Sequence, residues 1–122
     1  TVILWDIFGE LGAAYHYSQA VYVGGSMVPL GGQNFLEPLL SGCKPTIGKD
    51  WQNFSWVGRE IIDLELVEEV GTWQEMLDTL LRNIENPPQR EKLKEQAIIY
   101  VNKRQGGTLQ ACKTIAESLI DT

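Results

Sequence analysis

The residue types best suited to bind a ligand lie in one glycine-rich loop, residues 24–33, which reads GGSMVPLGGQ. Glycine allows a backbone to pass close to a ligand and to adopt positive φ angles. A short helix is expected from Asn34 to Leu40, so its free N–H groups and the positive end of its dipole would point out of the loop. The sequence therefore predicts an anion site, suited to a phosphate, at the start of this helix.

Glu37 would lie one turn into the expected helix, where its carboxylate could accept two hydrogen bonds from a ribose diol. The glycine spacing fits neither the dinucleotide-binding fingerprint nor the P-loop lysine motif. A structural interpretation stays open, because Asn34 and Glu37 are spaced much as in a helix-capping box and the glycines could simply build turns. Ser26 could be only a turn hydroxyl, and Glu10 could only complement the dipole of a helix that starts there.

Short apolar segments alternate with helical ones along the chain, and this alternation predicts how the loop is held. Strands are expected at residues 1–5, 20–23, 44–47 and 66–70. Helices are expected at residues 10–18, 34–40, 53–62, 73–85, 89–103 and from 108 onward, with glycines 106 and 107 between the last two. Such βα units indicate an α/β fold with a Rossmann-like parallel sheet covered by helices on both faces. Ligands of these sheets bind outside the carboxyl ends of the strands, here residues 6–9, 24–33 and 48–52.

Composition limits the function classes that are open to the chain. Its 122 residues, 43% apolar and 21% charged, are typical of one globular domain. The net charge of −6 argues against non-specific binding to nucleic acid or to an anionic membrane surface. Cys43 and Cys112 have no metal-ligand spacing and are expected to be free thiols. We expect no metal, no cofactor and no nucleic-acid partner.

The glycine-rich loop resembles the donor site of the transferases of 3-deoxy-D-manno-octulosonic acid (Kdo). The resemblance rests on Gly-Gly-Ser at 24–26 followed by Gly-Gly-Gln-Asn-x-x-Glu-Pro at 31–38. It continues in three further pieces: Gly42-x-Lys44-Pro45, the segment 50–54, and Asp6-x-x-Gly9-Glu10-Leu11 followed by Tyr15. It spans most of residues 5–60. Gln33 stands where many members of this family have histidine, although its amide can still donate a hydrogen bond to a phosphate.

The resemblance implies that residues 1–122 form a single, truncated C-terminal domain of a two-domain (GT-B type) glycosyltransferase. Such a domain binds CMP-Kdo for transfer of Kdo to a lipid A precursor in lipopolysaccharide biosynthesis. The general base, a glutamate, and the acceptor site would lie on the missing N-terminal domain, so this chain alone would be inactive. The full-length enzyme would act at the cytoplasmic face of the bacterial inner membrane, and the fragment itself would be soluble. The residues expected to bind the donor are Gly9, Glu10, Gly25, Ser26, Gly31, Gly32, Gln33, Asn34 and Glu37.

Two other function classes stay open. The chain could be the donor domain of another glycosyltransferase, such as an enzyme that uses a UDP-sugar and shares the ribose-binding glutamate. It could instead be a non-catalytic nucleotide-binding or interaction module with a Rossmann-like core. The resemblance to the Kdo transferases also implies that the first strands of the domain are missing. A sheet without them has an exposed edge, so we expect a homodimer or strand exchange through residues 1–5.

Overall fold

The sheet is short, parallel and three-stranded over the residues that the structure describes. A computed structural model describes residues 1–6 and 9–120, apart from the side chains of residues 106–115 and 118–120. The strands, in their order across the sheet, are β1 (Val21–Tyr22), β2 (Pro45–Ile47) and β3 (Glu68–Glu69). Val21 lies opposite Pro45, and Thr46 lies opposite Glu68, with both pairs of strands parallel. The predicted parallel sheet is confirmed, with three strands over these residues in place of the expected four.

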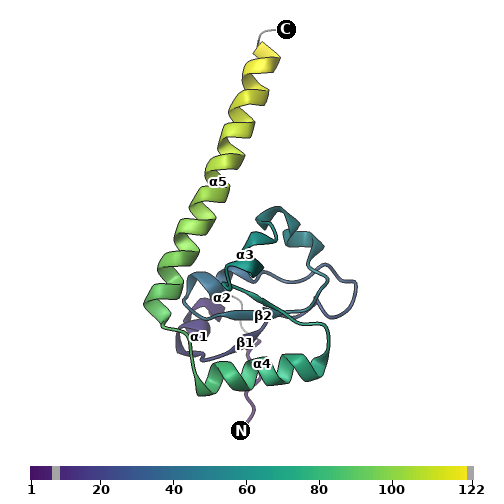
Figure 1. Ribbon diagram of the computed structural model, residues 1–122, viewed down its shortest axis with the longest axis vertical. Helices are drawn as coiled ribbons and strands as arrows, with labels where there is room; N and C mark the ends of the chain where they lie inside the picture. The colour runs from purple at the N-terminus through teal and green to yellow at the C-terminus, as the bar shows by residue number, and fades with distance from the viewer. Residues whose placement is uncertain (7–8, 121–122) are drawn as a thin grey trace.

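Helices lie on both sides of this sheet (Figure 1). They are α1 (Leu11–Tyr17), α2 (Leu36–Leu40), the 3-10 helix η1 (Gln52–Val57), α3 (Glu60–Asp63), α4 (Trp73–Glu85) and α5 (Arg90–Ile120). Figure 1 shows α4 on one side of the strands and α2 and α3 on the other. The predicted Rossmann-like arrangement is therefore confirmed. None of the described helices is both long and apolar enough to cross a membrane.

The core lies between the sheet and the helices α2, α3 and α5. Ile47 of β2 is buried there with Phe35, Leu39 and Ile61. Successive side chains of a strand point to opposite faces, so Thr46 lies on the other face of β2, the face that α4 covers. Tyr100 of α5 belongs to the same core, and its hydroxyl donates a hydrogen bond to the Val57 carbonyl at 2.6 Å. The first turns of α5 thereby hold the end of η1.

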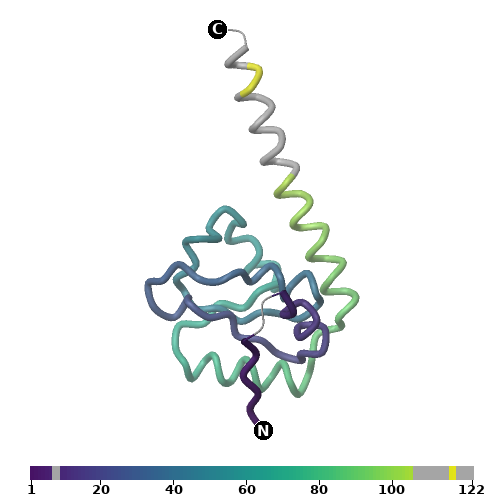
Figure 2. The backbone as a smooth tube through the Cα atoms, turned by 180° about the vertical axis from the view of Figure 1, so that it is seen from behind, coloured from purple at the N-terminus to yellow at the C-terminus, as the bar shows by residue number. Residues whose placement is uncertain are grey.

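The prediction of a buried strand at residues 1–5 is wrong. This segment forms no strand, and Val2, Ile3 and Leu4 are 97%, 78% and 87% exposed. Figures 1 and 2 show it extending from the body of the molecule to the N-terminus. The β-propensity of an apolar run reflects packing against neighbouring strands more than the backbone itself, and no described strand pairs with it.

Two predicted helix boundaries are also corrected. The single helix expected at 53–62 is divided by Gly58, whose φ of 88° ends η1 before α3 begins. Conversely, the two helices expected after residue 89 are one helix, α5, which continues through Gly106 and Gly107. A glycine inside a helix costs about 1 kcal/mol relative to alanine, and this cost lowers the helix propensity without ending the helix.

The amphipathic helix α4 starts where the sequence predicts. The Glu75 amide donates to the Thr72 hydroxyl at 3.2 Å, and the Glu75 carboxylate in turn accepts from the Gly71 amide at 2.7 Å. These two bonds satisfy backbone N–H groups that a helix start leaves free. The buried residues of α4 are Thr79 and Asn83. Its most apolar side faces solvent, with 46% to 62% exposure at Trp73, Leu77, Leu81 and Ile84.

Candidate functional site

The glycine-rich loop after β1 closes on itself at the carboxyl end of the sheet. The Gly32 amide donates to the Gly25 carbonyl at 2.9 Å, and the Gln33 amide donates to the Gly24 carbonyl at 3.0 Å. A third backbone bond, from the Asn53 amide to the Gly31 carbonyl at 3.0 Å, ties the loop to η1. The structure thus brings together four of the predicted site residues, Gly25, Gly31, Gly32 and Gln33.

Conformation favours glycine at two of these positions, and neighbouring atoms lie close to both. Gly31 and Gly32 have φ angles of 86° and 80°, in the left-handed region that side chains disfavour. A Cβ atom at Gly31 would lie 2.5 Å from the side-chain nitrogen Nδ2 of Asn53, and one at Gly32 would lie 3.3 Å from the Asp50 backbone carbonyl oxygen. Gly31 and Gly32 therefore do build a turn. Because they have no side chains, only their backbone atoms can contact a ligand.

Ser26 joins the ends of β1 and β2. Its hydroxyl is buried, donates to the Val23 carbonyl at 3.1 Å and accepts from the Gly48 amide at 2.8 Å. Its carbonyl accepts from the Asp50 amide at 2.9 Å. A side chain at Gly48 would collide with this segment. Both partners of the hydroxyl are backbone groups, so Ser26 holds the two loops in register.

Asn34 caps α2, which starts at Leu36 and therefore two residues later than predicted. The Leu36 amide donates to the Asn34 side-chain oxygen at 3.0 Å. Glu37 lies in the first turn of α2 and is exposed. No described residue donates a hydrogen bond to its carboxylate, so the reciprocal bond of a capping box is not formed. Glu37 is therefore free to accept hydrogen bonds from a ligand.

Glu37 also faces the helix α1. Burial, followed by the charge of the Glu37 carboxylate, raises the pKa of the Tyr15 phenol. Gly9, with a φ of 87°, and the exposed Glu10 immediately precede α1. Residues 7 and 8 lie outside the described residues, and the described contacts do not bring the Glu10 side chain against the glycine-rich loop.

Arg90 ties together the C-terminal ends of α1 and α2. Its guanidinium donates to the carbonyl oxygens of Tyr15 at 3.2 Å, Ser18 at 2.6 Å and Ser41 at 2.9 Å. Carbonyls at a helix end lack partners within the helix, and a cation there also complements the helix dipole. One side chain from α5 thus fixes the relative position of the two helices whose starts carry Glu10 and Asn34.

No protein-family model matches the chain. The chain is 37% identical over 93 residues to the 3-deoxy-D-manno-octulosonic acid transferase of Haemophilus influenzae, an alignment that covers 75% of this chain and 22% of the relative. The Bordetella pertussis protein of the same name is 27% identical over 118 residues, which is 97% of this chain and 28% of the relative. The chain also resembles the C-terminal CMP-Kdo binding domain of WaaA from Acinetobacter baumannii, with a TM-score of 0.69, 34% identity, and coverage of 80% of this chain and 51% of that one. The chain belongs to the Kdo transferase family.

The chain spans 22% to 28% of the length of the two transferases named above. Its glycine-rich turns, closed by backbone hydrogen bonds, lie at the carboxyl end of the sheet, where Rossmann-like folds bind ligands. The sheet with its helices matches the fold predicted for the donor-binding domain of the family.

The sequence analysis did not single out Asp50 as a candidate site residue. The side-chain oxygen Oδ1 of Asp50 is buried and has no hydrogen-bond partner among the described residues. The signal that could have identified it is its position, since Asp50 lies in the loop that follows β2 at the carboxyl end of the sheet. Its neighbour Trp51 is buried in the core, and the Trp51 indole N–H donates to the Glu69 carboxylate at 2.7 Å.

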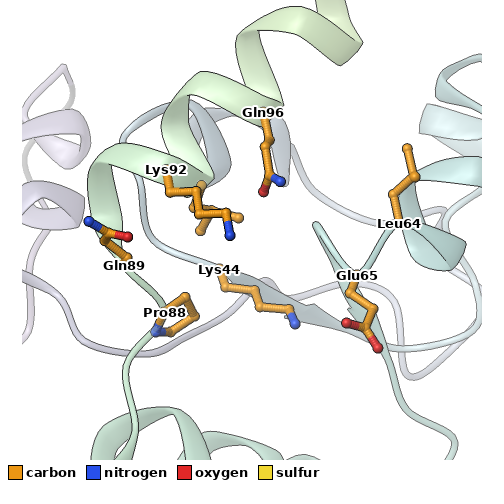
Figure 3. A pocket seen from close by; sticks show the side chains of 8 residues that line it. Lys44, Leu64, Glu65, Pro88, Gln89, Lys92 and Gln96 are labelled. Atoms are coloured by element: carbon orange, nitrogen blue, oxygen red, sulfur yellow. The ribbon is translucent and has the colours of Figure 1, made fainter.

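A hollow near the amino end of β2 contains none of the predicted site residues. It has a volume of about 280 Å³. Figure 3 shows Lys44 and Glu65 below it and three polar side chains of the α5 region, Gln89, Lys92 and Gln96, above it. The Lys44 ammonium is already paired with the Glu68 carboxylate at 3.0 Å. This hollow is open and Lys44, one of the two lysines that line it, is already paired, so it is a weaker candidate than the glycine-rich loop.

Proposed function

We propose that this chain binds CMP-Kdo as the donor-binding part of an enzyme that transfers Kdo to a lipid A precursor in lipopolysaccharide biosynthesis. The observation that carries the proposal is the structural likeness, at 34% identity, to a domain named for binding CMP-Kdo. The transferase names of the two bacterial relatives agree with it. The complete enzyme would act where its lipid acceptor is made, at the cytoplasmic face of the bacterial inner membrane.

The backbone of the glycine-rich loop is proposed to hold the phosphate of the donor. Gly25, Gly31, Gly32 and Gln33 lie together there, and Asn34 orders the start of α2 beside them. Backbone N–H groups in such turns, together with a helix start, attract anions. The Gly32 and Gln33 amides are already bonded within the loop, so the loop amides proposed for the phosphate are those of Gly25 and Gly31, which donate to no described residue. Ser26 supports this loop from beneath through its two backbone partners.

Glu37 is proposed to accept hydrogen bonds from the ribose hydroxyls. The support is its exposure in the first turn of α2, with no described residue donating to its carboxylate. Gly9 and Glu10, at the start of the neighbouring helix α1, are proposed to contact the sugar side of the same ligand.

Titration calorimetry with CMP, UMP and UDP-GlcNAc tests the proposal against both alternatives. Preference for the cytidine nucleotide is the expected result. Preference for the uridine compounds would identify a UDP-sugar enzyme, and no binding of any nucleotide would identify an interaction module. We further propose that the chain alone transfers no Kdo, because the general base and the acceptor site would lie on another domain.

The chain is also proposed to self-associate through its exposed apolar N-terminal segment. Val2, Ile3 and Leu4 are almost fully exposed, and the edge of β1 that does not face β2 pairs with no described strand. Unpaired strand edges and apolar segments promote association between chains. Light scattering should therefore give a mass above 13.7 kDa that rises with protein concentration. A constant monomer mass at high concentration would contradict this.

A further inference from the structure

We infer that Asp50 is a further donor-site residue, whose carboxylate accepts a hydrogen bond from a hydroxyl or amino group of the bound nucleotide sugar. This inference rests on the proposed function. It adds an acceptor to a site whose other proposed elements are glycine backbone, Asn34 and Glu37.

The backbone places Asp50 against both glycine-rich turns. Its amide donates to the Ser26 carbonyl at 2.9 Å, next to the Gly24-Gly25 turn. Its carbonyl oxygen lies 3.3 Å from the position that a Cβ at Gly32 would take. Asp50 therefore lies between the two segments that the proposed function assigns to the donor, at the carboxyl end of β2.

The Asp50 carboxylate differs from the carboxylates of Glu69 and Glu75, because no described residue donates a hydrogen bond to it. The Glu69 carboxylate accepts from Arg59 and Trp51, and the Glu75 carboxylate accepts from the Gly71 amide. Oδ1 of Asp50 is buried, and no described residue donates to it. Burying an acceptor without a donor is costly, and more so for a charged group. A hydrogen-bond donor on a bound ligand would remove this cost.

The chemistry of a carboxylate restricts which part of the ligand it can meet. An ionised carboxylate only accepts hydrogen bonds, and it repels the phosphate and the acid group of the donor. Its partner is therefore an uncharged O–H or N–H donor, either the amino group of cytosine or a hydroxyl of one of the sugars. The adjacent Lys49 does not fill this role, since its ammonium lies beside Gly71 and contributes to the low pKa of Glu69.

The test compares Asp50→Asn with Asp78→Asn, the same chemical change at an exposed position on α4. Calorimetry on the chain would use CMP, UMP and CMP-Kdo, with melting temperatures measured without ligand. Asp50→Asn should weaken binding by about 5- to 30-fold, because hydrogen bonds to a charged acceptor are roughly twice as strong as neutral ones. Its melting temperature should stay the same or rise, and Asp78→Asn should change neither quantity.

Comparing the three ligands identifies which ligand group donates the hydrogen bond to Asp50. Weaker binding of both CMP and CMP-Kdo, with a reduced preference for CMP over UMP, would assign Asp50 to the cytosine amino group. A loss confined to CMP-Kdo would assign it to a Kdo hydroxyl. Asp50→Glu, which keeps the charged acceptor, should retain part of the affinity that Asp50→Asn loses and guards against a folding defect in the asparagine variant. Unchanged affinities for all ligands would overturn the inference while leaving the proposed function standing, whereas no nucleotide binding by the wild-type chain would overturn both.

Discussion

The Ser26 hydroxyl accepts a hydrogen bond from the Gly48 amide at 2.8 Å, although the two residues lie 22 positions apart in the sequence. The same hydroxyl donates to the Val23 carbonyl. One small side chain therefore joins the loop after β1 to the loop after β2, the two loops from which the proposed donor site is built.

Replacing Ser26 by alanine should destabilise the domain by about 1–3 kcal/mol, because the buried Gly48 amide is left without an acceptor. Urea denaturation would measure the change in the free energy of unfolding. Ser41→Ala is the matched control, since the Ser41 hydroxyl donates to a single exposed carbonyl, that of Glu37. Ser41→Ala should lower the free energy of unfolding less than Ser26→Ala does. Equal losses would contradict the stabilising role assigned to the hydrogen bonds of Ser26.

Arg90 should resist replacement even by lysine. The guanidinium donates to three carbonyls at the ends of α1 and α2, and Arg90→Ala should cost about 2–3 kcal/mol, given the strength of hydrogen bonds from charged donors. A lysine ammonium lacks the planar fork that reaches several acceptors at once, so Arg90→Lys should recover only a small part of the loss. Full recovery by lysine, measured by urea denaturation, would show that only the charge matters.

Glu65 occupies a backbone conformation suited to glycine. Its φ is 60°, and the Leu66 and Glu65 amides donate to the Ile61 and Ile62 carbonyls, which is a Schellman-type end for α3. Glu65→Gly removes the strain of the left-handed region, about 1–2 kcal/mol, against an entropy cost of about 0.5–1 kcal/mol. Thermal unfolding should show a net gain in stability of up to about 1.5 kcal/mol. Glu65→Ala keeps the Cβ atom and should show no such gain. If Glu65→Ala is stabilised as much as Glu65→Gly, the gain comes from removing the charge and not from the backbone conformation.

Replacing Glu37 by glutamine tests whether its carboxylate binds the ligand or stabilises α2. Glu37→Gln keeps the shape and removes the charge, so CMP binding should weaken by about 5- to 30-fold if the carboxylate holds the ribose diol. The melting temperature should hardly change, because no described residue donates to this carboxylate. Unchanged affinity with a lowered melting temperature would assign Glu37 to the structure of α2 and would also weaken the roles proposed for Asn34 and the loop at 31–33.

Features of the site that depend on local chemistry could be predicted from the sequence. The turns at Gly31 and Gly32 and the capping role of Asn34 follow from residue types and short spacings. The parallel sheet followed from the alternation of apolar segments with helices. The loop motif was sufficiently distinctive to identify the family.

Features that depend on distant partners could not be predicted. Residues 1–5 have the composition of a strand, but strand formation needs a neighbour that local sequence does not specify. The bridging role of Ser26 depends on Gly48, and the buried oxygen of Asp50 depends on how three loops pack. The exposure of the apolar side of α4 could not be predicted either. Periodicity shows that a helix has an apolar side but not which part of the protein covers that side.

Binding of CMP-Kdo to the wild-type chain, followed by displacement with free nucleotides, tests the central claim most directly. The account predicts saturable binding with one ligand per chain, and it predicts that CMP displaces the bound CMP-Kdo at concentrations where UMP does not. Saturable binding that UMP reverses as well as CMP, or the absence of any binding, would contradict the assignment of this chain as a CMP-Kdo-binding domain.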